Sequence, residues 1–223
     1  MALATAFTAT SCQSDEEHTQ QPTGKEFKSA ITGKAYATEP DCEVNWVQLW
    51  ENGPKFAEYN IGATSATEYG GYYTWGGTFK NEQGSWQDDH NRGTESLSGI
   101  DDTATNLWGD KWRMPTKEEL DNLLAKCDVK WIDGSNEKYN NTTVTGLLCT
   151  GKDAYSSNSV FLPAASYCSD RHVYGQGDFG YYWSSTPDGS YACRLFFDSG
   201  RQYVYSNDDR YEGYSVRAVL AEE

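Results

Sequence analysis

The order of apolar and polar residues predicts many short strands rather than long helices. From Asn45 to Trp50 the sequence NWVQLW is rich in Trp, Val and Leu, which is typical of a strand. Six later stretches, separated by Gly, Asp and Ser, show the same kind of pattern. They are NTTVTGLLCT, SVFLPAA, YYWSST, CRLFFD, RQYVY and YSVRAVL, within residues 141–220.

Two helix signals accompany these strands. Thr116 and Glu119 have capping-box spacing, and Leu120, Leu123 and Leu124 follow on one helical face. Ser65 and Glu68 repeat the capping-box spacing before Gly70 and Gly71, so a short helix is predicted there too. Residues 79–104 are polar and aperiodic and are interpreted as a loop. The predicted fold class is α+β, with two short helices and small antiparallel sheets.

The stretch from Cys193 to Arg217 resembles a β-hairpin that carries unusual side chains toward solvent. Side chains of a strand alternate between its two faces, so one face should enter the core and the other should be exposed. The predicted core residues are Trp183, Leu195, Phe197, Val204 and Val216. The residues predicted to be exposed on one face are Arg194, Phe196, Asp198, Arg201, Tyr203 and Tyr205.

Length, charge and the first residues set further limits. The 223 residues suit one sizeable domain, and a formal net charge of −15 opposes binding to nucleic acid or to anionic lipid. The apolar segment MALATAFTATSC precedes an abruptly acidic run, which indicates a processing segment. The expected organisation is a signal segment at 1–12, a polar tether at 13–30 and one folded domain at 31–223.

The sequence offers little catalytic chemistry. It holds three His and lacks the H-E-x-x-H, G-x-S-x-G and P-loop patterns. The run GQGDFG matches a nucleotide-loop pattern, but a strand rather than a helix is predicted after it, so Gly175, Gly177 and Gly180 are interpreted as turn glycines. The polar cluster around His90 is interpreted as solvated rather than as a metal site. We expect no catalytic residues, no cofactor and no metal.

The cysteines remain open to two interpretations. Without Cys12 their number is odd, and none has metal-site spacing. A bridge between Cys127 and Cys149 and a set of buried free thiols are both compatible with the sequence.

Several motifs together resemble a known family. The order WVQLW, NIGAT, WRMPT, FLPAA, YYWSST and SVRAV, from about residue 45 to 219, is similar to the Fibrobacter succinogenes major paralogous domain. That resemblance implies a C-type-lectin-like fold, with the strand at Trp46–Trp50 beside the strand at Tyr214–Leu220. Arg113 and Arg217 lie inside these motifs and are expected to be scaffold residues held by carboxylates or carbonyls.

The resemblance also implies a function. It points to surface lipoproteins of gut bacteria and to variable proteins of diversity-generating retroelements, in which a C-terminal face is diversified to bind ligands. ATSC before an acidic run resembles a lipoprotein signal, so Cys12 is the expected lipid anchor and the outer-membrane cell surface the expected location. The expected partner is a protein or glycan on a cell, phage or host surface, and a monomer is expected.

Diversification of this kind acts on adenines and excludes Lys, Glu, Gln, Met and Trp from the varied positions. All 11 Lys lie at or before Lys152, and neither Lys nor Met follows it, whereas ten of the 16 Tyr do. The expected ligand-binding residues are Asp170, Arg171, His172, Tyr174, Asp178, Tyr181, Tyr191, Arg194, Phe196, Asp198, Arg201, Tyr203, Tyr205, Asn207, Asp208, Tyr211 and Tyr214.

Three alternatives limit this expectation. The Glu-Pro-Asn loop of calcium-dependent lectins is absent late in the chain, and TEPD at Thr38–Asp41 lies too early, so ligand binding without calcium is expected. A fixed-specificity carbohydrate-binding module or adhesin is the first alternative function. More distantly, Cys168 and Cys193 allow comparison with formylglycine-generating oxidases, although their neighbours do not resemble that enzyme's site.

Overall fold

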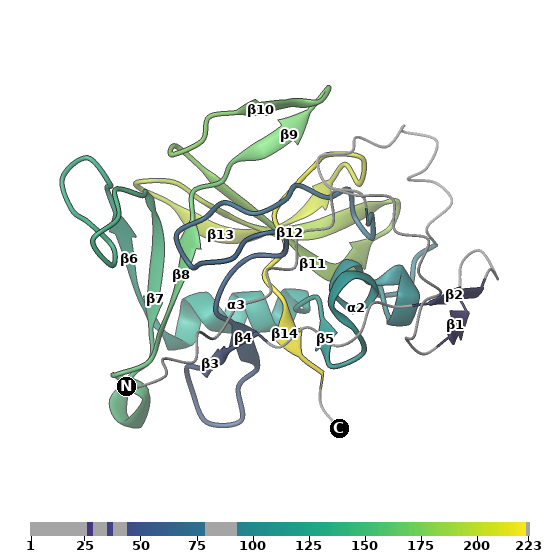
Figure 1. Cartoon of the computed structure of the whole chain (residues 1–223), viewed down its shortest axis with the longest axis horizontal. Helices are drawn as coiled ribbons and strands as arrows, with labels where there is room; N and C mark the ends of the chain where they lie inside the picture. Colours follow the sequence, from purple (N-terminus) through teal and green to yellow (C-terminus); the bar gives the residue numbers. More distant parts are fainter. Residues whose placement is uncertain (1–25, 29–34, 38–43, 79–92, 222–223) are drawn as a thin grey trace, which may run out of the picture.

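The computed structural model describes residues 26–28, 35–37, 44–78 and 93–221 (Figure 1). Cys12, Thr38–Asp41, Cys42 and His90 lie outside the described residues. Small antiparallel sheets and few helices make up the described chain, which confirms the predicted α+β class. Two short strands, β1 (Glu26–Lys28) and β2 (Ala35–Ala37), pair with each other, so a part of the expected tether lies in a hairpin.

A four-stranded sheet joins the two ends of the domain. Its order is β3 (Trp46–Gln48), β4 (Lys55–Ala57), β14 (Val219–Leu220) and β5 (Trp112–Arg113). The strand at Trp46 was expected to lie beside the C-terminal strand, and this is wrong, because β4 pairs with both and separates them. The chain turns back directly after β3, and the returning strand therefore takes the inner position.

A second sheet follows helix α3 (Lys117–Lys126) along the chain. Strands β6 (Asp128–Ile132), β7 (Gly146–Thr150) and β8 (Ser159–Pro163) form an antiparallel meander. A short 3₁₀ helix, η2 (Asp153–Tyr155), connects the last two. In Figure 1 this sheet stands at the left of the molecule.

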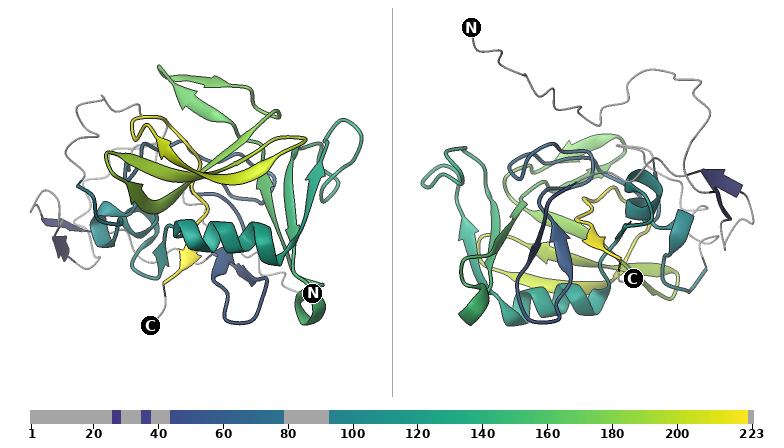
Figure 2. Two further views of the ribbon diagram at one scale, coloured as in Figure 1. Left: turned by 180° about the vertical axis from the view of Figure 1, so that it is seen from behind. Right: turned by 60° about the horizontal axis from the view of Figure 1, so that its bottom comes forward.

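The third sheet carries the predicted face. It consists of β11 (Gly180–Asp188), β12 (Tyr191–Phe197) and β13 (Gln202–Asp208), with β12 in the middle. The hairpin of β9 (Tyr167–Ser169) and β10 (His172–Tyr174) projects on one side of this sheet. Helix α3 (Lys117–Lys126) runs along its other side (Figure 2).

Helix α3 forms where its sequence predicts it. Thr116 accepts a hydrogen bond from the Glu119 N–H at 3.2 Å, and the Glu119 carboxylate accepts one from the Thr116 N–H at 2.8 Å. This reciprocal capping box satisfies two donors that a helix start leaves free. Leu120 and Leu123 are buried against the sheet, while Leu124 is only partly buried.

The second predicted helix is wrong in position. Residues 65–68 form turns, and the Glu68 carboxylate binds Thr64 rather than the Ser65 backbone. Instead, α2 (Thr103–Trp108) lies at the end of the stretch interpreted as a loop, after the 3₁₀ helix η1 (Gly99–Asp101). Buried Asp102 caps α2, accepting hydrogen bonds from the N–H groups of Ala104, Thr105 and also Met114.

Three arginines connect separate parts of the fold. Arg217 is 1% exposed and donates to Asn60 and to the carbonyls of Ala57, Glu58 and Phe161. Arg113 forms a bidentate pair with Glu119. Both therefore have the kind of partners predicted for scaffold residues.

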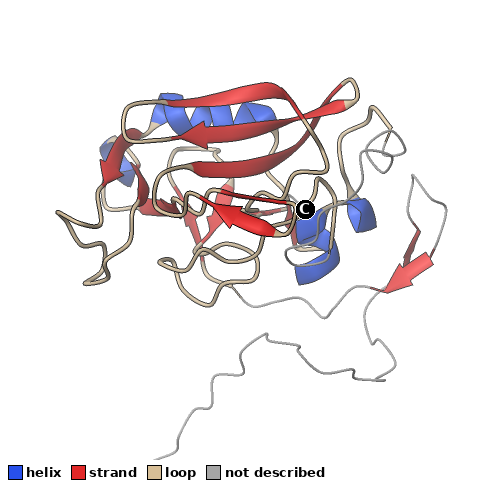
Figure 3. Cartoon of the chain, turned by 90° about the horizontal axis from the view of Figure 1, so that it is seen from above, coloured by secondary structure: helices blue, strands red, loops and turns tan. Residues whose placement is uncertain are grey.

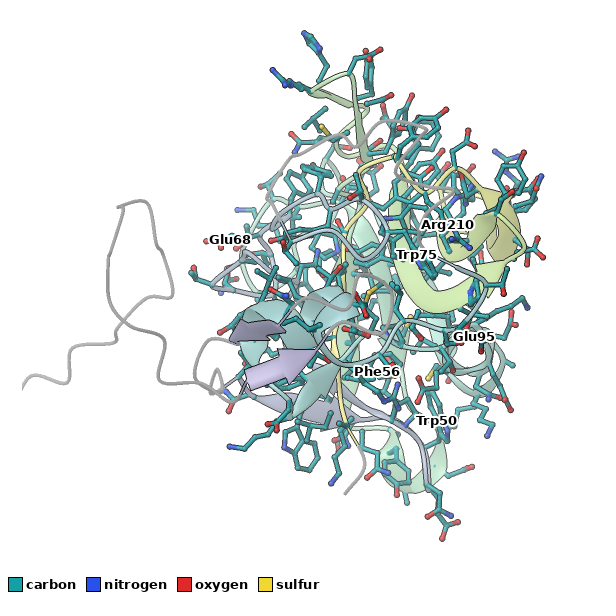
Figure 4. All side chains as sticks on the ribbon, turned by 90° about the vertical axis from the view of Figure 1, so that its right-hand side faces the viewer. Trp50, Phe56, Glu68, Trp75, Glu95 and Arg210 are labelled. Carbon is teal, nitrogen blue, oxygen red and sulfur yellow. The ribbon has the colours of Figure 1, made fainter. Side chains whose placement is uncertain are left out.

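Arg210 is a third such residue, which the sequence did not single out. It donates to the carbonyls of Tyr191, Gly93 and Gly189, and its guanidinium lies 4.2 Å from the Trp75 ring centroid. Figure 4 labels the two side chains next to each other. Among the described residues no helix is long and apolar enough to cross a membrane.

Candidate functional site: an aromatic face on the C-terminal sheet

The two faces of the C-terminal sheet have the predicted orientation. Leu195 and Phe197 of β12 are fully buried on the side of α3, where partly buried Val204 of β13 joins them. Trp183 and Val216 are buried in a second cluster. The register pairs Leu195 with Val204, Phe196 with Tyr203 and Arg194 with Tyr205, so the last two pairs share the opposite face. Figure 3 shows this sheet from above.

Two residues of that opposite face are buried, which corrects their predicted exposure. Phe196 is 5% exposed and Arg194 is 9% exposed. The alternation assigned them to the correct face, but other side chains cover them. The rings of Tyr181, Phe179 and Tyr203 lie 5.1, 6.1 and 5.2 Å from the Phe196 ring. Phe196 is therefore part of the support of the face rather than of its surface.

The exposed layer above this support is aromatic. Tyr203 and Tyr205 are 40% and 43% exposed and meet edge to face at 6.4 Å. On the β9–β10 hairpin, Tyr174 is 44% exposed and stacks on half-buried Tyr167 at 5.3 Å. Tyr167 in turn contacts Tyr181 at 5.4 Å. A continuous series of ring contacts thus connects Tyr174 with Tyr205. We call the residues of this series the aromatic face: Tyr167, Tyr174, Tyr181, Phe196, Tyr203 and Tyr205.

Arg194 lies at the centre of the aromatic face. Its guanidinium is 4.6 Å from the Tyr181 ring centroid and 5.2 Å from that of Tyr205. Its Nε donates to Asp208, whose other carboxylate oxygen accepts a hydrogen bond from the Tyr214 hydroxyl at 2.9 Å. Tyr214 is 4% exposed, so it too belongs to the support and not to the surface. Burial raises the pKa of Tyr214 far above its usual value, so its hydroxyl remains a donor.

A β-bulge brings Asp208 to Arg194. Between the pairs Arg194–Tyr205 and Ala192–Asp208, β13 advances three residues while β12 advances two. Asn207, with φ of 78°, takes up the extra residue in the left-handed region that Asn tolerates. Without the bulge, Asp208 would point to the other face, because strand residues alternate. The bulge therefore builds the ion pair.

The turn between β12 and β13 is fixed by Asp198. Its carboxylate accepts from the N–H groups of Gly200 and Arg201 and also pairs with the Arg201 guanidinium at 2.6 Å. These hydrogen bonds, chiefly the one from the Arg201 side chain, lower the pKa of Asp198. Arg201 is exposed as predicted, whereas Asp198 is only partly exposed because it folds back onto the turn.

The tip of the β9–β10 hairpin has an unusual backbone. Asp170 and Arg171 have φ of 48° and 62°, the combination of a type I′ turn, in which Asn or Asp is usually followed by Gly, so Arg171 is the exceptional residue. Both side chains and that of His172 are exposed. Neighbouring Val173 is 40% exposed and is an addition to the predicted residues. The supporting rings Tyr167 and Phe179 were also missed, because a supporting role depends on contacts between strands that the sequence does not display.

The remaining predicted residues are dispersed. Asp178 and Asn207 are exposed, and half-buried Tyr211 donates to Asp209 at 3.0 Å. Tyr191 is 39% exposed, but it shares the strand face of Leu195, so the structure separates it from the aromatic face. Gly175 and Gly177 have φ of 59° and 93° and are turn glycines as predicted. Gly180 is not, since it lies in β11.

The described cysteines are free thiols. Cys127, Cys149, Cys168 and Cys193 are all buried, so the bridge considered for the first two is absent and the free-thiol interpretation is correct. Burial raises the pKa of Cys168 and of Cys193, which disfavours the reactive thiolate. In the described part of the chain, no group of three His, Cys, Asp or Glu could hold a metal ion.

A hollow lies away from the aromatic face. Its volume is about 310 Å³. It is lined by Glu58, Tyr59, Thr64, Ser65, Ala66, Thr67, Asn140 and Thr142. None of these residues was predicted to bind a ligand.

Comparison with known proteins matches the C-terminal part of the chain to a family model. A family model described as a domain of unknown function (DUF8237) matches residues 130–219. That part of the chain is similar to this domain. The matched residues run from β6 to β14. They include the aromatic face and the opposite, α3-facing side of the same sheet. No curated protein and no solved structure has a significant match to the chain.

Proposed function

We propose that this chain is a non-catalytic ligand-binding protein that uses the aromatic face to hold a protein or glycan on another surface. The observation that carries the proposal is the exposure of Tyr174, Tyr203 and Tyr205 above a buried layer of rings. Large exposed apolar side chains in a group mark interaction sites, and Tyr is among the residues that dominate interface energies. The buried layer keeps the exposed rings in place, which limits the entropy lost on binding.

The shape of the face favours a large ligand. Its exposed rings come from the edge strand β13 and from a separate hairpin, and they lie on a surface rather than around an enclosed cavity. Small metabolites usually bind in concave sites that enclose most of their surface. A macromolecule can contact both elements at once.

A C-type-lectin-like fold and diversification by a retroelement complete the proposal. The α+β architecture with small antiparallel sheets is compatible with that fold. Tyr203 and Tyr205 obey the expected substitution rule, whereas Gln202, which precedes them on the α3-facing side of the strand, does not. Positions open to variation would thus alternate with scaffold positions along β13. The test is to sequence the DNA around the gene. Diversification predicts a nearby reverse-transcriptase gene and a template repeat that differs from this gene at adenines.

A fixed adhesin is the second candidate. It would use the same aromatic face without any template repeat, and the gene neighbourhood discriminates between the two. The oxidase alternative receives less support, because it needs reactive thiols and burial raises the pKa of both Cys168 and Cys193.

Binding is tested with a triple variant. Tyr203, Tyr205 and Tyr211 are replaced by Ala, and wild type and variant are screened against bacterial and host surface extracts with and without a calcium chelator. We expect the variant to lose binding and wild type to bind equally with chelator. Binding that disappears on chelation but tolerates the substitutions would indicate metal-dependent lectin chemistry and refute the proposal.

The proposed cell-surface lipoprotein has its own test. Cys12→Ala should abolish incorporation of a labelled fatty acid and release the protein from the outer membrane. Protease treatment of intact cells should remove the wild-type protein. Lipid labelling that is the same in wild type and Cys12→Ala would contradict the anchor.

The proposed monomer has support from the bulge at Ser206 and Asn207. β13 is an edge strand, and free edges invite pairing with other chains. A bulge bends and twists the strand, which makes continuous pairing along that edge unfavourable. Sedimentation equilibrium of the soluble chain should give the monomer mass.

A further inference from the structure

The guanidinium of Arg194 has an unsatisfied donor. Its Nε is committed to Asp208, but Nη1 is buried and has no hydrogen-bond partner among the described residues. A buried donor without a partner destabilises the fold, and the cost is larger when the group is charged. Such groups are rare in folded proteins and need an explanation. Here the group lies at the centre of the aromatic face.

The surroundings of Arg194 leave one direction open. Four rings lie near the guanidinium, those of Tyr181, Phe196, Tyr205 and Tyr214. Phe196 and Tyr214 are buried and Tyr181 is half-buried, whereas Tyr205 is 43% exposed on an edge strand. Tyr205 is therefore the ring that can rotate at the lowest cost. Its rotation would open the guanidinium to a ligand, and the Nη edge is the part that Asp208 does not use.

The charges nearby select the type of acceptor. Asp208 already balances Arg194, and Asp198 balances Arg201. The carboxylates of Asp170, Asp209 and Glu212 form no ion pair within the described part of the chain. Burial raises the pKa of Glu212, and repulsion from Asp208, Asp209 and Asp170 raises it further, so the local potential is negative. An anionic ligand is disfavoured, whereas a neutral acceptor is not.

We propose that the Nη edge of Arg194, beneath the Tyr205 ring, is a subsite for a neutral amide carbonyl of the ligand. An amide oxygen has two lone pairs in its plane and can accept both Nη donors, and its flat shape fits between aromatic rings. The bulge at Asn207 has a role in this subsite, because it places Asp208 to orient the guanidinium from behind. The inference rests on the proposed function and specifies part of its ligand.

An amide carbonyl has two sources, the acetamido group of a sugar and the peptide group of a protein. The test uses the full chain with ¹⁵N-labelled Arg and follows the Arg194 Nε–H signal in NMR titrations. N-methylacetamide is the neutral probe, and acetate is its anionic control of similar size. N-acetylglucosamine and N-acetylglycine N-methylamide then represent the two sources.

We expect N-methylacetamide to shift the Arg194 signal to saturation and acetate to leave it unchanged. Arg194→Lys keeps the positive charge but loses the planar pair of Nη donors. It should bind the amide at least about tenfold more weakly than wild type. Lys152→Arg, a change at an exposed cation outside the aromatic face, is the control and should bind like wild type. Equal binding of acetate, or no shift with N-methylacetamide, would overturn the proposal.

The wild-type titration remains decisive if Arg194→Lys does not fold. The outcome of the amide titration can be distinguished from the outcome of the surface-binding test of the proposed function. If surface binding is lost in the Tyr triple variant but amides leave Arg194 unaffected, only the subsite is refuted. If amides bind at Arg194 but the triple variant keeps its surface binding, the aromatic face is not the macromolecular site.

Discussion

The ring of Phe197 lies directly against the Cα atom of Gly180 across the β11–β12 pair. The two residues are register partners, and a Cβ atom at position 180 would overlap the ring. Gly180 is thus required for packing rather than for backbone conformation. The sequence placed it with two turn glycines because all three fall in one short motif, and only the pairing of the strands distinguishes them.

Gly180→Ala is expected to be strongly destabilising. The added methyl group must displace a fully buried ring, and overpacking of this kind typically costs about 1–3 kcal/mol. Urea unfolding at neutral pH measures the effect. Gly200→Ala is the control, since a Cβ there meets only a side-chain oxygen of Asp198 at 3.8 Å. Equal midpoints for the two variants would contradict this packing.

Arg217→Met should be among the most destabilising single substitutions in the chain. The buried guanidinium donates to four oxygens, and its removal leaves buried acceptors without donors. Loss of one partner of a buried charged network costs about 3–5 kcal/mol. Burial lowers the pKa of Arg217 to about 10, so the side chain stays charged at neutral pH.

The control for this substitution is Arg113→Ala, which breaks a partly exposed pair with Glu119 and should cost less. Thermal melting of both variants measures the order. A melting temperature for Arg217→Met at or above that of Arg113→Ala would refute the assigned role.

Asp102 should give the protein a recognisable pH dependence. Burial raises its pKa to about 6 from the ordinary 3.8, although three backbone N–H groups oppose the shift. A raised carboxyl pKa stabilises the fold fully below the unfolded-state value, and this contribution is lost as the pH rises through 6. The loss amounts to at most about 3 kcal/mol.

The measurement compares wild type with Asp102→Asn by urea unfolding from pH 4 to pH 7. Asn keeps the cap of α2 through one oxygen but presents an NH₂ group where Met114 needs an acceptor, so it destabilises at every pH. The difference between the two proteins should be larger at pH 4 than at pH 7. A difference that grows toward pH 7 would show that the carboxyl pKa is lowered instead.

Exposed and supporting residues of the aromatic face should separate in stability measurements. Phe196→Ala removes a buried ring and should cost about 3–5 kcal/mol. Tyr203→Ser removes an exposed ring and should cost well under half of that, since most surface substitutions have small effects. Chemical unfolding of both variants gives the comparison. Similar losses would mean that Tyr203 is part of the core.

Local signals were the most reliable guide to the fold. The cap at Thr116 predicted α3 because the capping bonds and the apolar stripe lie within one short segment. The same spacing at Ser65 failed, since no apolar stripe follows it and Glu68 binds Thr64 instead. Helix α2 was missed because its six residues are too few to show a period, although Asp102 before it is a good cap.

For the candidate site, the sequence predicted which face of the strand each side chain lies on but not how deeply each side chain is buried. Strand alternation assigned Phe196 and Arg194 to the face of Tyr203 and Tyr205, which is correct. Alternation does not show what covers a face, and here Tyr181 and Phe179 come from another strand and a loop. The partnership of Arg194 with Asp208 was beyond the sequence for the same reason, since it depends on a bulge that shifts the alternation by one residue.

The alternation along β13 has a consequence for how this protein can evolve. Val204 is partly buried toward α3, while Tyr203 and Tyr205 on either side of it point away from the scaffold. Substitutions at the two tyrosines leave the inner row of side chains unchanged. Different side chains can therefore occupy these two positions without disturbing the packing of the sheet against α3. A single strand therefore alternates positions that the fold constrains with exposed positions that tolerate substitution, so the surface of β13 can change while its inner row stays constant.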